Sequence, residues 1–236
     1  MLFYYIRHGT PTYKPDDLTE EGELQSKALA ERLSFTGVDK IFSSDSVRAL
    51  KTAKFTADNL NKEITVLPWA NENLAAKDFY VYYKDIGGWT YENEELLKVF
   101  NSAEVFSLGE EWTSYSLFSE YNFKSGIERI AKEADNFFGN LGYIHNRKNR
   151  TYTINKGNDE KVALFAHSGF GMAFLSSVLD IPYPLFITRF QQIAFSGVTI
   201  IDFSGGKEVF PRIISYSDNS HLYKNNMQPF NCIDIV

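Results

Sequence analysis

Two of the four histidines in this chain stand beside a glycine, directly after a run of strand-forming residues. His8 lies in Arg7-His8-Gly9, behind the apolar run at 2–6, and His167 begins the string His167-Ser168-Gly169, behind the apolar run at 161–166. In open α/β sheets the ligand site lies beyond the carboxyl ends of the strands. We therefore predict that both imidazoles face the same crevice.

Arg48 is a third candidate for that crevice. With Asp45 as the predicted N-cap of the helix at 45–60, Arg48 falls in the first turn, where a cation opposes the helix dipole at a cost of up to ~1 kcal/mol. An arginine that turns into solvent, or pairs with Asp45, would explain this position by itself. Beside Arg7, His8 and His167, however, an anion-binding role is the favoured interpretation. The free N–H groups of the helix start would act on the same anion.

The elements that must position these residues alternate along the chain. Apolar residues recur at spacings of three and four in the helical stretches, and Thr19 is the predicted N-cap of the first. Strands that alternate with helices predict an α/β fold with a mainly parallel sheet. We predict strands at 2–6, 38–44, 64–67, 161–166, 197–203 and 209–216, the last being an edge or bulged strand because of Pro211, and helices in 18–33, 45–60, 124 to near Gly139 or Gly142, and the second half of 167–179.

The composition limits the class of partner. The net charge of −6 and the 44% of hydrophobic residues fit a soluble globular protein and argue against sequence-independent nucleic-acid binding, which needs clustered cations. No apolar run approaches the ~20 residues of a membrane span. A strand-like run follows Met1, so we expect no secretory leader and predict a cytoplasmic protein. Cys232 is the single cysteine, and no intramolecular disulfide is expected.

Four blocks of sequence carry a resemblance to a known family. They are "RHG" at 7–9, "LTEEG" at 18–22, "SSDSVRALKTA" at 43–53 and "AHSG" at 166–169. In this order they resemble the histidine phosphatase superfamily, the phosphoglycerate-mutase-like fold. The resemblance implies an α/β three-layer sandwich with a mainly parallel central sheet, in a single domain over 1–236 with an aromatic-rich cap inserted at about 75–125.

The resemblance also implies a covalent mechanism, in which His8 attacks phosphorus and water then hydrolyses the phosphohistidine. Arg7, Arg48 and His167 match the phosphate pocket of the family, and guanidinium groups suit the equatorial oxygens of a transferring phosphoryl group. The two arginines should lower the pKa of His8 below the usual ~6.5 and keep it nucleophilic. Four further residues are predicted to contact the phosphate. Gly9 and Gly169 would let the backbone come close to its oxygens, and Thr10 and Ser168 would add hydrogen bonds.

The leaving alcohol needs a proton donor, which the family usually supplies from a carboxylic acid after the third strand. The matching residue is Glu72. Many relatives continue with a glycine and a Trp-Glu-Gly string, whereas this chain reaches "GGW" only at 87–89. Asp78, Glu92 and Glu110 therefore remain alternative acids.

Aromatic residues crowd the segment from 79 to 123, and the sequence leaves three roles open for them: the core of a small cap, the lining of a site for an organic leaving group, or a dimer surface. They are Phe79, Tyr80, Tyr82, Tyr83, Trp89, Tyr91, Phe100, Phe106, Trp112, Tyr115, Phe118, Tyr121 and Phe123.

These observations together favour a metal-independent phosphomonoesterase of the histidine acid phosphatase type. The expected partner is a small phosphorylated metabolite, without nucleic acid, membrane or cofactor, and a homodimer is left open. A phosphomutase of the same superfamily is the first alternative, although "TPTYK" replaces the serine and Trp-Asn pair usual in mutases, and residues 75–125 contain no arginine. A relative that binds a phospho-ligand without turnover is the second.

Overall fold

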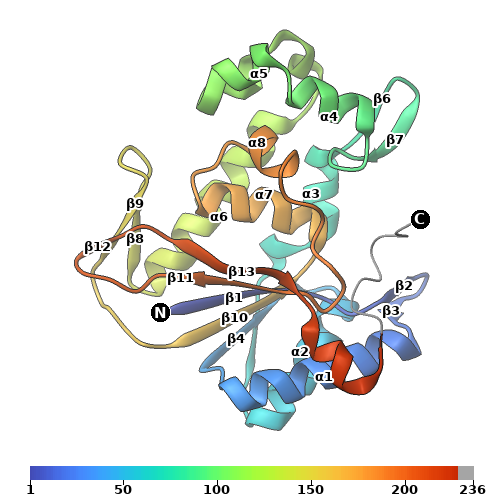
Figure 1. Cartoon of the computed structure of the whole chain (residues 1–236), viewed down its shortest axis with the longest axis vertical. Coiled ribbons are helices and arrows are strands. Elements are labelled where there is room, and N and C mark those ends of the chain that lie inside the picture. Colours follow the sequence, from blue (N-terminus) through green and yellow to red (C-terminus); the bar gives the residue numbers. More distant parts are fainter. Residues whose placement is uncertain (228–236) are drawn as a thin grey trace.

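A six-stranded sheet forms the centre of the computed structural model, which describes residues 1–227 (Figure 1). The strand order is β13-β11-β1-β10-β4-β5, and β1, β10, β4 and β5 run parallel, whereas β11 and β13 are antiparallel to their neighbours. The predicted mainly parallel sheet is therefore confirmed. The bounds are β1 (Leu2–Arg7), β4 (Lys40–Ser43), β5 (Ile64–Val66), β10 (Lys161–Ala166), β11 (Val198–Asp202) and β13 (Arg212–Asp218).

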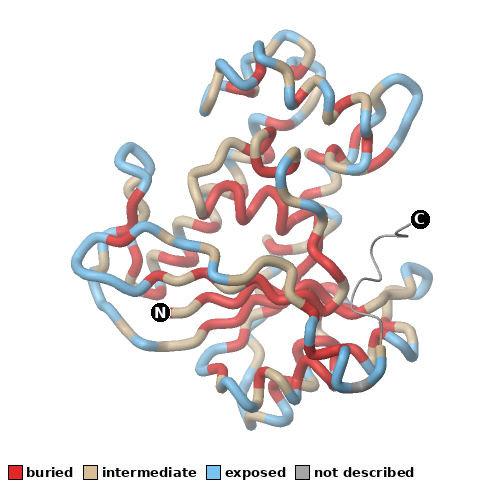
Figure 2. The backbone as a smooth tube through the Cα atoms, in the orientation of Figure 1, coloured by how far each residue is buried: buried red, intermediate tan, exposed pale blue. Residues whose placement is uncertain are grey.

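Helices cover both faces of this sheet, as a three-layer sandwich requires. Alternation along β1 decides which side chain meets which layer, because successive residues of a strand point to opposite faces. Tyr4 and Ile6 pack with residues of α1 (Glu20–Thr36) and α2 (Val47–Leu60). Phe3 and Tyr5 pack with residues of α6 (Phe123–Asn140) and α7 (Ser168–Val178). Figure 2 shows the buried backbone concentrated in the strands between these layers.

The register brings the site residues to one edge of the sheet. Arg7 pairs with Ala166, and Phe165 pairs with Ser43, so the carboxyl ends of β1, β10 and β4 lie side by side. His8 and His167 follow the first two of these strands directly, as predicted.

The helix caps agree with the sequence at one position and differ at another. The Thr19 side chain accepts a hydrogen bond from the Gly22 N–H, which confirms it as the N-cap of α1. The prediction of Asp45 as the N-cap of α2 was wrong: Ser46 takes that place and accepts from the Ala49 N–H. Polar residues suited to capping follow one another after β4, and the bend of the chain puts the extended backbone at Ser46.

Three small β-structures were not predicted. They are the β2 (Pro11–Tyr13)–β3 (Asp16–Leu18) hairpin, the β6 (Tyr80–Tyr83)–β7 (Ile86–Trp89) hairpin, and a three-stranded sheet of β8 (Tyr143–Asn146), β9 (Thr151–Ile154) and β12 (Glu208–Val209). The single strand expected at 209–216 is split at Pro211 into β12 and the edge strand β13, whose pairing with β11 is irregular.

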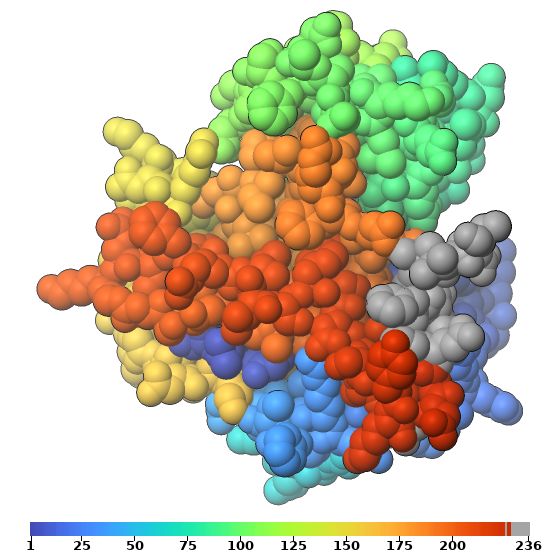
Figure 3. Space-filling view, viewed as in Figure 1, coloured from blue at the N-terminus to red at the C-terminus, as the bar shows by residue number. Residues whose placement is uncertain are grey.

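The insertion from 75 to 125 holds short helices and the β6–β7 hairpin, and it lies over α7 and α8 at one end of the molecule (Figure 3). Its buried rings pack together, with the ring centroids of Phe100 and Phe118 4.9 Å apart. They also pack on α8 (Tyr183–Ile187), where the ring centroids of Phe79 and Tyr183 lie 4.9 Å apart. Its helices are α4 (Glu94–Phe100), α5 (Ala103–Leu108) and most of α3 (Glu72–Phe79), with 3₁₀ turns at η2 (Gly109–Ser114) and η3 (Ser116–Glu120). Two further 3₁₀ turns lie outside the insertion, at η1 (Pro68–Ala70) and η4 (Ser220–Asn225).

Core packing thus accounts for five predicted cap aromatics, namely Phe79, Phe100, Trp112, Phe118 and Phe123, whereas Tyr82 and Phe106 are exposed. The division into one domain with a cap insertion stays a prediction. Cys232 lies outside the described residues. None of the helices in residues 1–227 has the length and apolar character needed to span a membrane.

Candidate active site

Arg7, His8, Arg48 and His167 converge at the carboxyl edge of the sheet. The ring centroids of His8 and His167 lie 5.2 Å apart, and Arg48 Nε donates to His8 Nε2 over 3.2 Å. All four residues are buried. The strings around His8 and His167, which are more than a hundred residues apart in sequence, therefore meet with Arg48 in one buried cluster.

The hydrogen bonds of His8 fix its tautomer. His8 Nδ1 lies 2.7 Å from the Gly9 carbonyl oxygen, which can only accept, so Nδ1 carries the proton. Nε2 then holds the lone pair, to which Arg48 donates. Burial lowers the pKa of His8 well below its usual value, and the charges of Arg7 and Arg48 lower it further against the opposing Gly9 bond. The ring is therefore neutral at pH 7, and its Nε2 lone pair accepts the hydrogen bond from Arg48.

Residues outside the four-residue cluster fix the positions of both arginines. Arg7 Nη1 donates to the carbonyl oxygen of Ile193, and its guanidinium carbon lies 3.9 Å from the centre of the Phe195 ring. Arg48 Nη1 donates to Asp16 Oδ1 over 2.7 Å, and Asp16 Oδ2 accepts from the N–H of Val47 over 2.9 Å. The Asp16 carboxylate therefore compensates the cation at the start of α2 that the sequence left unexplained.

His167 is the N-cap of α7 and is fully buried. The Tyr5 hydroxyl donates to its carbonyl oxygen over 2.6 Å, and its Nε2 lies 2.9 Å from Ser44 Oγ. Its Nδ1 has no hydrogen-bond partner within residues 1–227, and the nearest acidic atom is Glu72 Oε2, 3.9 Å away. Burial lowers the pKa of His167 well below its usual value, and the positive charges of the cluster act in the same direction.

Glu72 stands at the start of α3 and reaches this cluster. Its Oε1 accepts from the N–H of Gly169 over 3.0 Å, and its Oε2 accepts from the N–H of Phe170 over 3.2 Å. Burial raises the pKa of Glu72, although both hydrogen bonds and the charges of the two arginines oppose that shift. A carboxyl group with a raised pKa keeps more of its proton at neutral pH, as a general acid requires.

The alternative acids have other contacts. Asp78 Oδ2 accepts from Arg129 over 2.6 Å, and Glu110 Oε1 lies 3.0 Å from Arg150 Nη2 at an exposed site. Glu92 Oε2 accepts from the backbone N–H of Trp89 over 3.2 Å. Among the four predicted candidates, Glu72 is the carboxyl that the structure places next to His167.

The four residues predicted to support phosphate are already bonded within the protein. The N–H of Gly9 donates to Thr52 Oγ1, the Thr10 hydroxyl donates to Gln25, and Ser168 Oγ accepts from the N–H of Ile193. The role of the glycines in phosphate binding stays a prediction, and the structure adds a packing reason for them, because their missing side chains make room for protein atoms. A Cβ at Gly9 would lie 2.5 Å from the Gly22 oxygen, and one at Gly169 would lie 2.3 Å from the Trp89 ring.

The two remaining histidines, His145 and His221, are hydrogen-bonded to residues outside the four-residue cluster. His145 bridges Asp135 and Asp180 at 2.8 Å from each carboxylate. His221 Nε2 lies 3.0 Å from Ser196 Oγ, and burial lowers its pKa to about 4.

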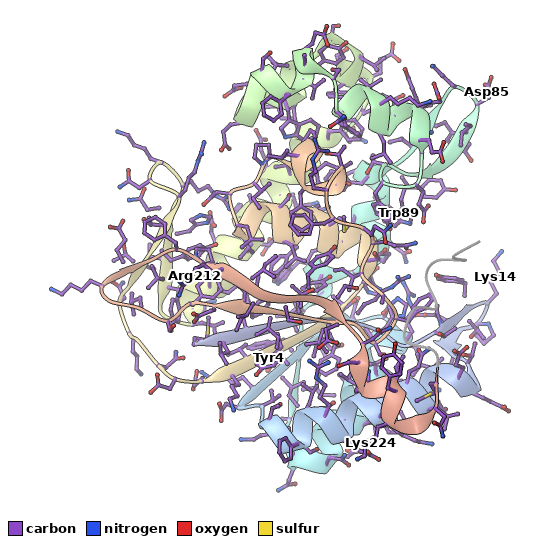
Figure 4. The ribbon with its side chains drawn as sticks, viewed as in Figure 1. Tyr4, Lys14, Asp85, Trp89, Arg212 and Lys224 are labelled. Carbon is purple, nitrogen blue, oxygen red and sulfur yellow. The ribbon has the colours of Figure 1, made fainter. Side chains whose placement is uncertain are left out.

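Sequence reasoning left open whether the aromatics of the insertion line the site, and it did not predict the β6–β7 hairpin that carries Trp89. Trp89 lies where this hairpin approaches the carboxyl edge of the sheet (Figure 4). The pKa of the Tyr91 hydroxyl is raised well above the usual value, first by burial and then by the charge of Glu72. The string "GGW" could have signalled a close approach of backbone to ring, but nothing in the sequence indicated the position of Tyr91.

Comparison with known proteins agrees with this architecture. The model of the histidine phosphatase superfamily (branch 1) matches residues 3–74, and curated protein sequences give no match. A phosphoserine phosphatase mutant from Entamoeba histolytica is a similar solved structure, with a TM-score of 0.58 at 19% identity over 94% of this chain and 98% of that one.

Two further solved structures have the same fold. The α-ribazole phosphatase from Shigella flexneri has a TM-score of 0.59 at 16% identity, covering 93% of this chain and 97% of its own. A mycobacterial glucosyl-3-phosphoglycerate phosphatase has a TM-score of 0.53 at 16% identity, covering 93% and 98%. The resemblance to the histidine phosphatase superfamily is thereby confirmed, in sequence over residues 3–74 and in fold over most of the chain.

Proposed function

We propose that this protein is a metal-independent phosphomonoesterase of small phosphorylated metabolites that acts through a phosphohistidine at His8. The observation that carries the proposal is the buried contact of His8 Nε2 with Arg48 Nε at 3.2 Å. A neutral imidazole beside a guanidinium is the arrangement that attack on a bound phosphate would need. The names of the similar solved structures as phosphatases support the reaction class.

The first step forms a bond between His8 Nε2 and phosphorus and breaks the bond from phosphorus to the ester oxygen. The lone pair of Nε2 is engaged by Arg48 in the free protein, so the guanidinium must turn from the ring to the phosphate oxygens when substrate binds. Arg7 and His167 would hold the same oxygens. The proton on Nδ1 remains bonded to the Gly9 carbonyl, which stabilises the charge that develops on the ring.

Glu72 would give its proton to the departing alkoxide in this step and become a carboxylate. In the second step that carboxylate would take a proton from water as the water oxygen attacks phosphorus. The bond from phosphorus to Nε2 then breaks, and inorganic phosphate leaves neutral His8 behind. The protein thus ends each cycle in its initial protonation state.

The test is phosphate release from p-nitrophenyl phosphate by the wild type and by His8→Ala, with His145→Gln as a matched change at a histidine remote from the cluster. We expect His8→Ala to lose activity and His145→Gln to retain it. A rapid acid-free quench with ³²P-labelled substrate should trap an acid-labile label on the wild type alone. Equal release by the wild type and His8→Ala would refute the proposal.

The same experiment separates the alternatives. A phosphomutase would need a bisphosphate primer and would release little free phosphate. A phospho-ligand-binding relative would bind inorganic phosphate in calorimetry and release none from any ester.

A further inference from the structure

Ser44 carries a fully buried hydroxyl in the sequence block at 43–53, and the proposed chemistry at His8 gives this hydroxyl no role. The residue follows β4 directly, next to the end of β10 (Figure 1). Its N–H donates to the carbonyl oxygen of Phe165 over 2.9 Å. The pairing of β4 with β10 therefore fixes the backbone from which the Ser44 side chain reaches His167, the residue after β10.

The Ser44 oxygen makes two hydrogen bonds within residues 1–227. It accepts from the N–H of Ser46 over 3.4 Å, and it lies 2.9 Å from His167 Nε2. Because the Ser46 bond uses the proton of Ser46, the hydroxyl proton of Ser44 has only His167 Nε2 as an acceptor in that part of the chain. A buried donor without an acceptor costs about 1–3 kcal/mol. The Ser44 hydroxyl therefore donates to His167 Nε2.

A donor at Nε2 determines which nitrogen of His167 carries the ring proton. Burial, and then the positive charges around it, hold the pKa of His167 well below its usual value, so the ring has one proton at neutral pH. Since Nε2 accepts from Ser44, that proton is on Nδ1. Nδ1 is the buried nitrogen that has no hydrogen-bond partner among the described residues, and Glu72 Oε2 lies 3.9 Å from it. His167 thus holds an N–H donor without an acceptor, beside the proposed general acid.

We propose that Ser44 is a positioning residue of the candidate active site: its hydroxyl fixes the Nδ1–H tautomer of His167, which keeps a hydrogen-bond donor for an oxygen of the phosphate ester. The inference rests on the proposed phosphatase function and adds a residue to its phosphate pocket. The other tautomer would present the lone pair of Nδ1 to an anion and would leave the Ser44 proton without an acceptor.

Tyr5 fixes the backbone of the same histidine. Its hydroxyl donates to the carbonyl oxygen of His167 over 2.6 Å and accepts from the His167 N–H over 3.3 Å. The backbone and the ring of His167 are therefore held by different residues. A change at Ser44 should alter the proton position on the ring while the backbone of His167 stays bound to Tyr5.

The first experiment reads the tautomer without turnover. Nuclear magnetic resonance of ¹⁵N-labelled protein at neutral pH distinguishes protonated from unprotonated ring nitrogens, and His167→Gln identifies the signals of His167 among those of the four histidines. We expect Nδ1 of His167 to carry the proton in the wild type and Nε2 to carry it in a large fraction of Ser44→Ala. A wild type with the proton on Nε2 would overturn the inference, and so would an unchanged tautomer in Ser44→Ala.

The second experiment measures phosphate recognition. Ser44→Ala should lower kcat/KM for p-nitrophenyl phosphate and raise the inhibition constant of inorganic phosphate, each about 10–100-fold, as expected for loss of a hydrogen bond to a charged group. Ser44→Thr restores a hydroxyl and should recover part of both losses together with the wild-type tautomer. Ser176→Ala is the matched control, because this buried hydroxyl donates to the Ala173 carbonyl oxygen inside α7.

Equal kinetic losses in Ser44→Ala and Ser176→Ala would leave Ser44 with a packing role only and would refute the proposal. If Ser44→Ala does not fold, the spectrum of the wild type decides. Failure of the phosphatase function would give a different result, namely hydrolysis of p-nitrophenyl phosphate that is absent or does not depend on His8, whatever the tautomer of His167.

Discussion

Replacement of Glu72 by glutamine is the sharpest perturbation of the proposed mechanism, because the substitution removes the acidic proton and keeps the size of the side chain. The carboxylate accepts one hydrogen bond on each oxygen, from the N–H groups of Gly169 and Phe170. Glutamine retains one of these acceptors. Its amide nitrogen would face the other N–H, and the lost buried hydrogen bond should reduce the free energy of unfolding by about 1–3 kcal/mol.

The effect on activity should depend on the leaving group. General acid catalysis contributes about 10²–10⁴-fold, so kcat of Glu72→Gln should fall in that range for alkyl phosphates, whose alkoxides are strong bases. Nitrophenolate leaves without much protonation, and its ester should slow by less than about tenfold. Because burial raises the pKa of Glu72, the alkaline fall of kcat that reports this acid should lie above the usual range for glutamate and should be absent in the variant.

The assay compares kcat for p-nitrophenyl phosphate and ethyl phosphate over pH 5 to 9, with urea unfolding to show that the variant is folded. Asp78→Asn is the matched control, since this carboxyl pairs with Arg129 away from the histidines. Equal slowing of both esters by Glu72→Gln would refute the assignment of the proton donor. If Asp78→Asn slowed ethyl phosphate much more than p-nitrophenyl phosphate, Asp78 would be the proton donor instead.

Three other changes test the surroundings of the site. Asp16→Asn weakens the anchor of Arg48 and should lower kcat/KM for p-nitrophenyl phosphate about tenfold, whereas unchanged kinetics would show that Arg48 holds its position alone. Gly169→Ala places a methyl group 2.3 Å from the Trp89 ring and should cost about 1–3 kcal/mol in urea unfolding; a loss within error would contradict that packing. The pKa of His221 is about 4 in the folded protein, below its unfolded value of ~6.5, so the unfolded chain binds more protons between these pH values. The free energy of unfolding should therefore decrease as the pH is lowered through this window. At pH 4 the wild type should have lost about 3 kcal/mol more than His221→Gln, and parallel plots of unfolding free energy against pH for the two proteins would refute the shift.

The sequence alone determined the parts of this protein that depend on local chain chemistry. A buried strand followed at once by histidine and glycine is readable at His8 and at His167, because strand-forming runs and breakers are local signals. The parallel arrangement follows from the alternation of strands with helices, and it places both histidines at one edge. The acid at Glu72 came from the family resemblance rather than from any local pattern.

Tertiary structure decided whatever depends on contacts between distant segments. Asp16 meets Arg48 only because the β2–β3 hairpin folds against the start of α2, and a choice among neighbouring caps at Asp45 and Ser46 depends on the bend between β4 and α2. The insertion shows the same limit. Its aromatic composition is evident in sequence, but burial of Phe100 and the approach of Trp89 to Gly169 are set by packing across the chain, which no local propensity encodes.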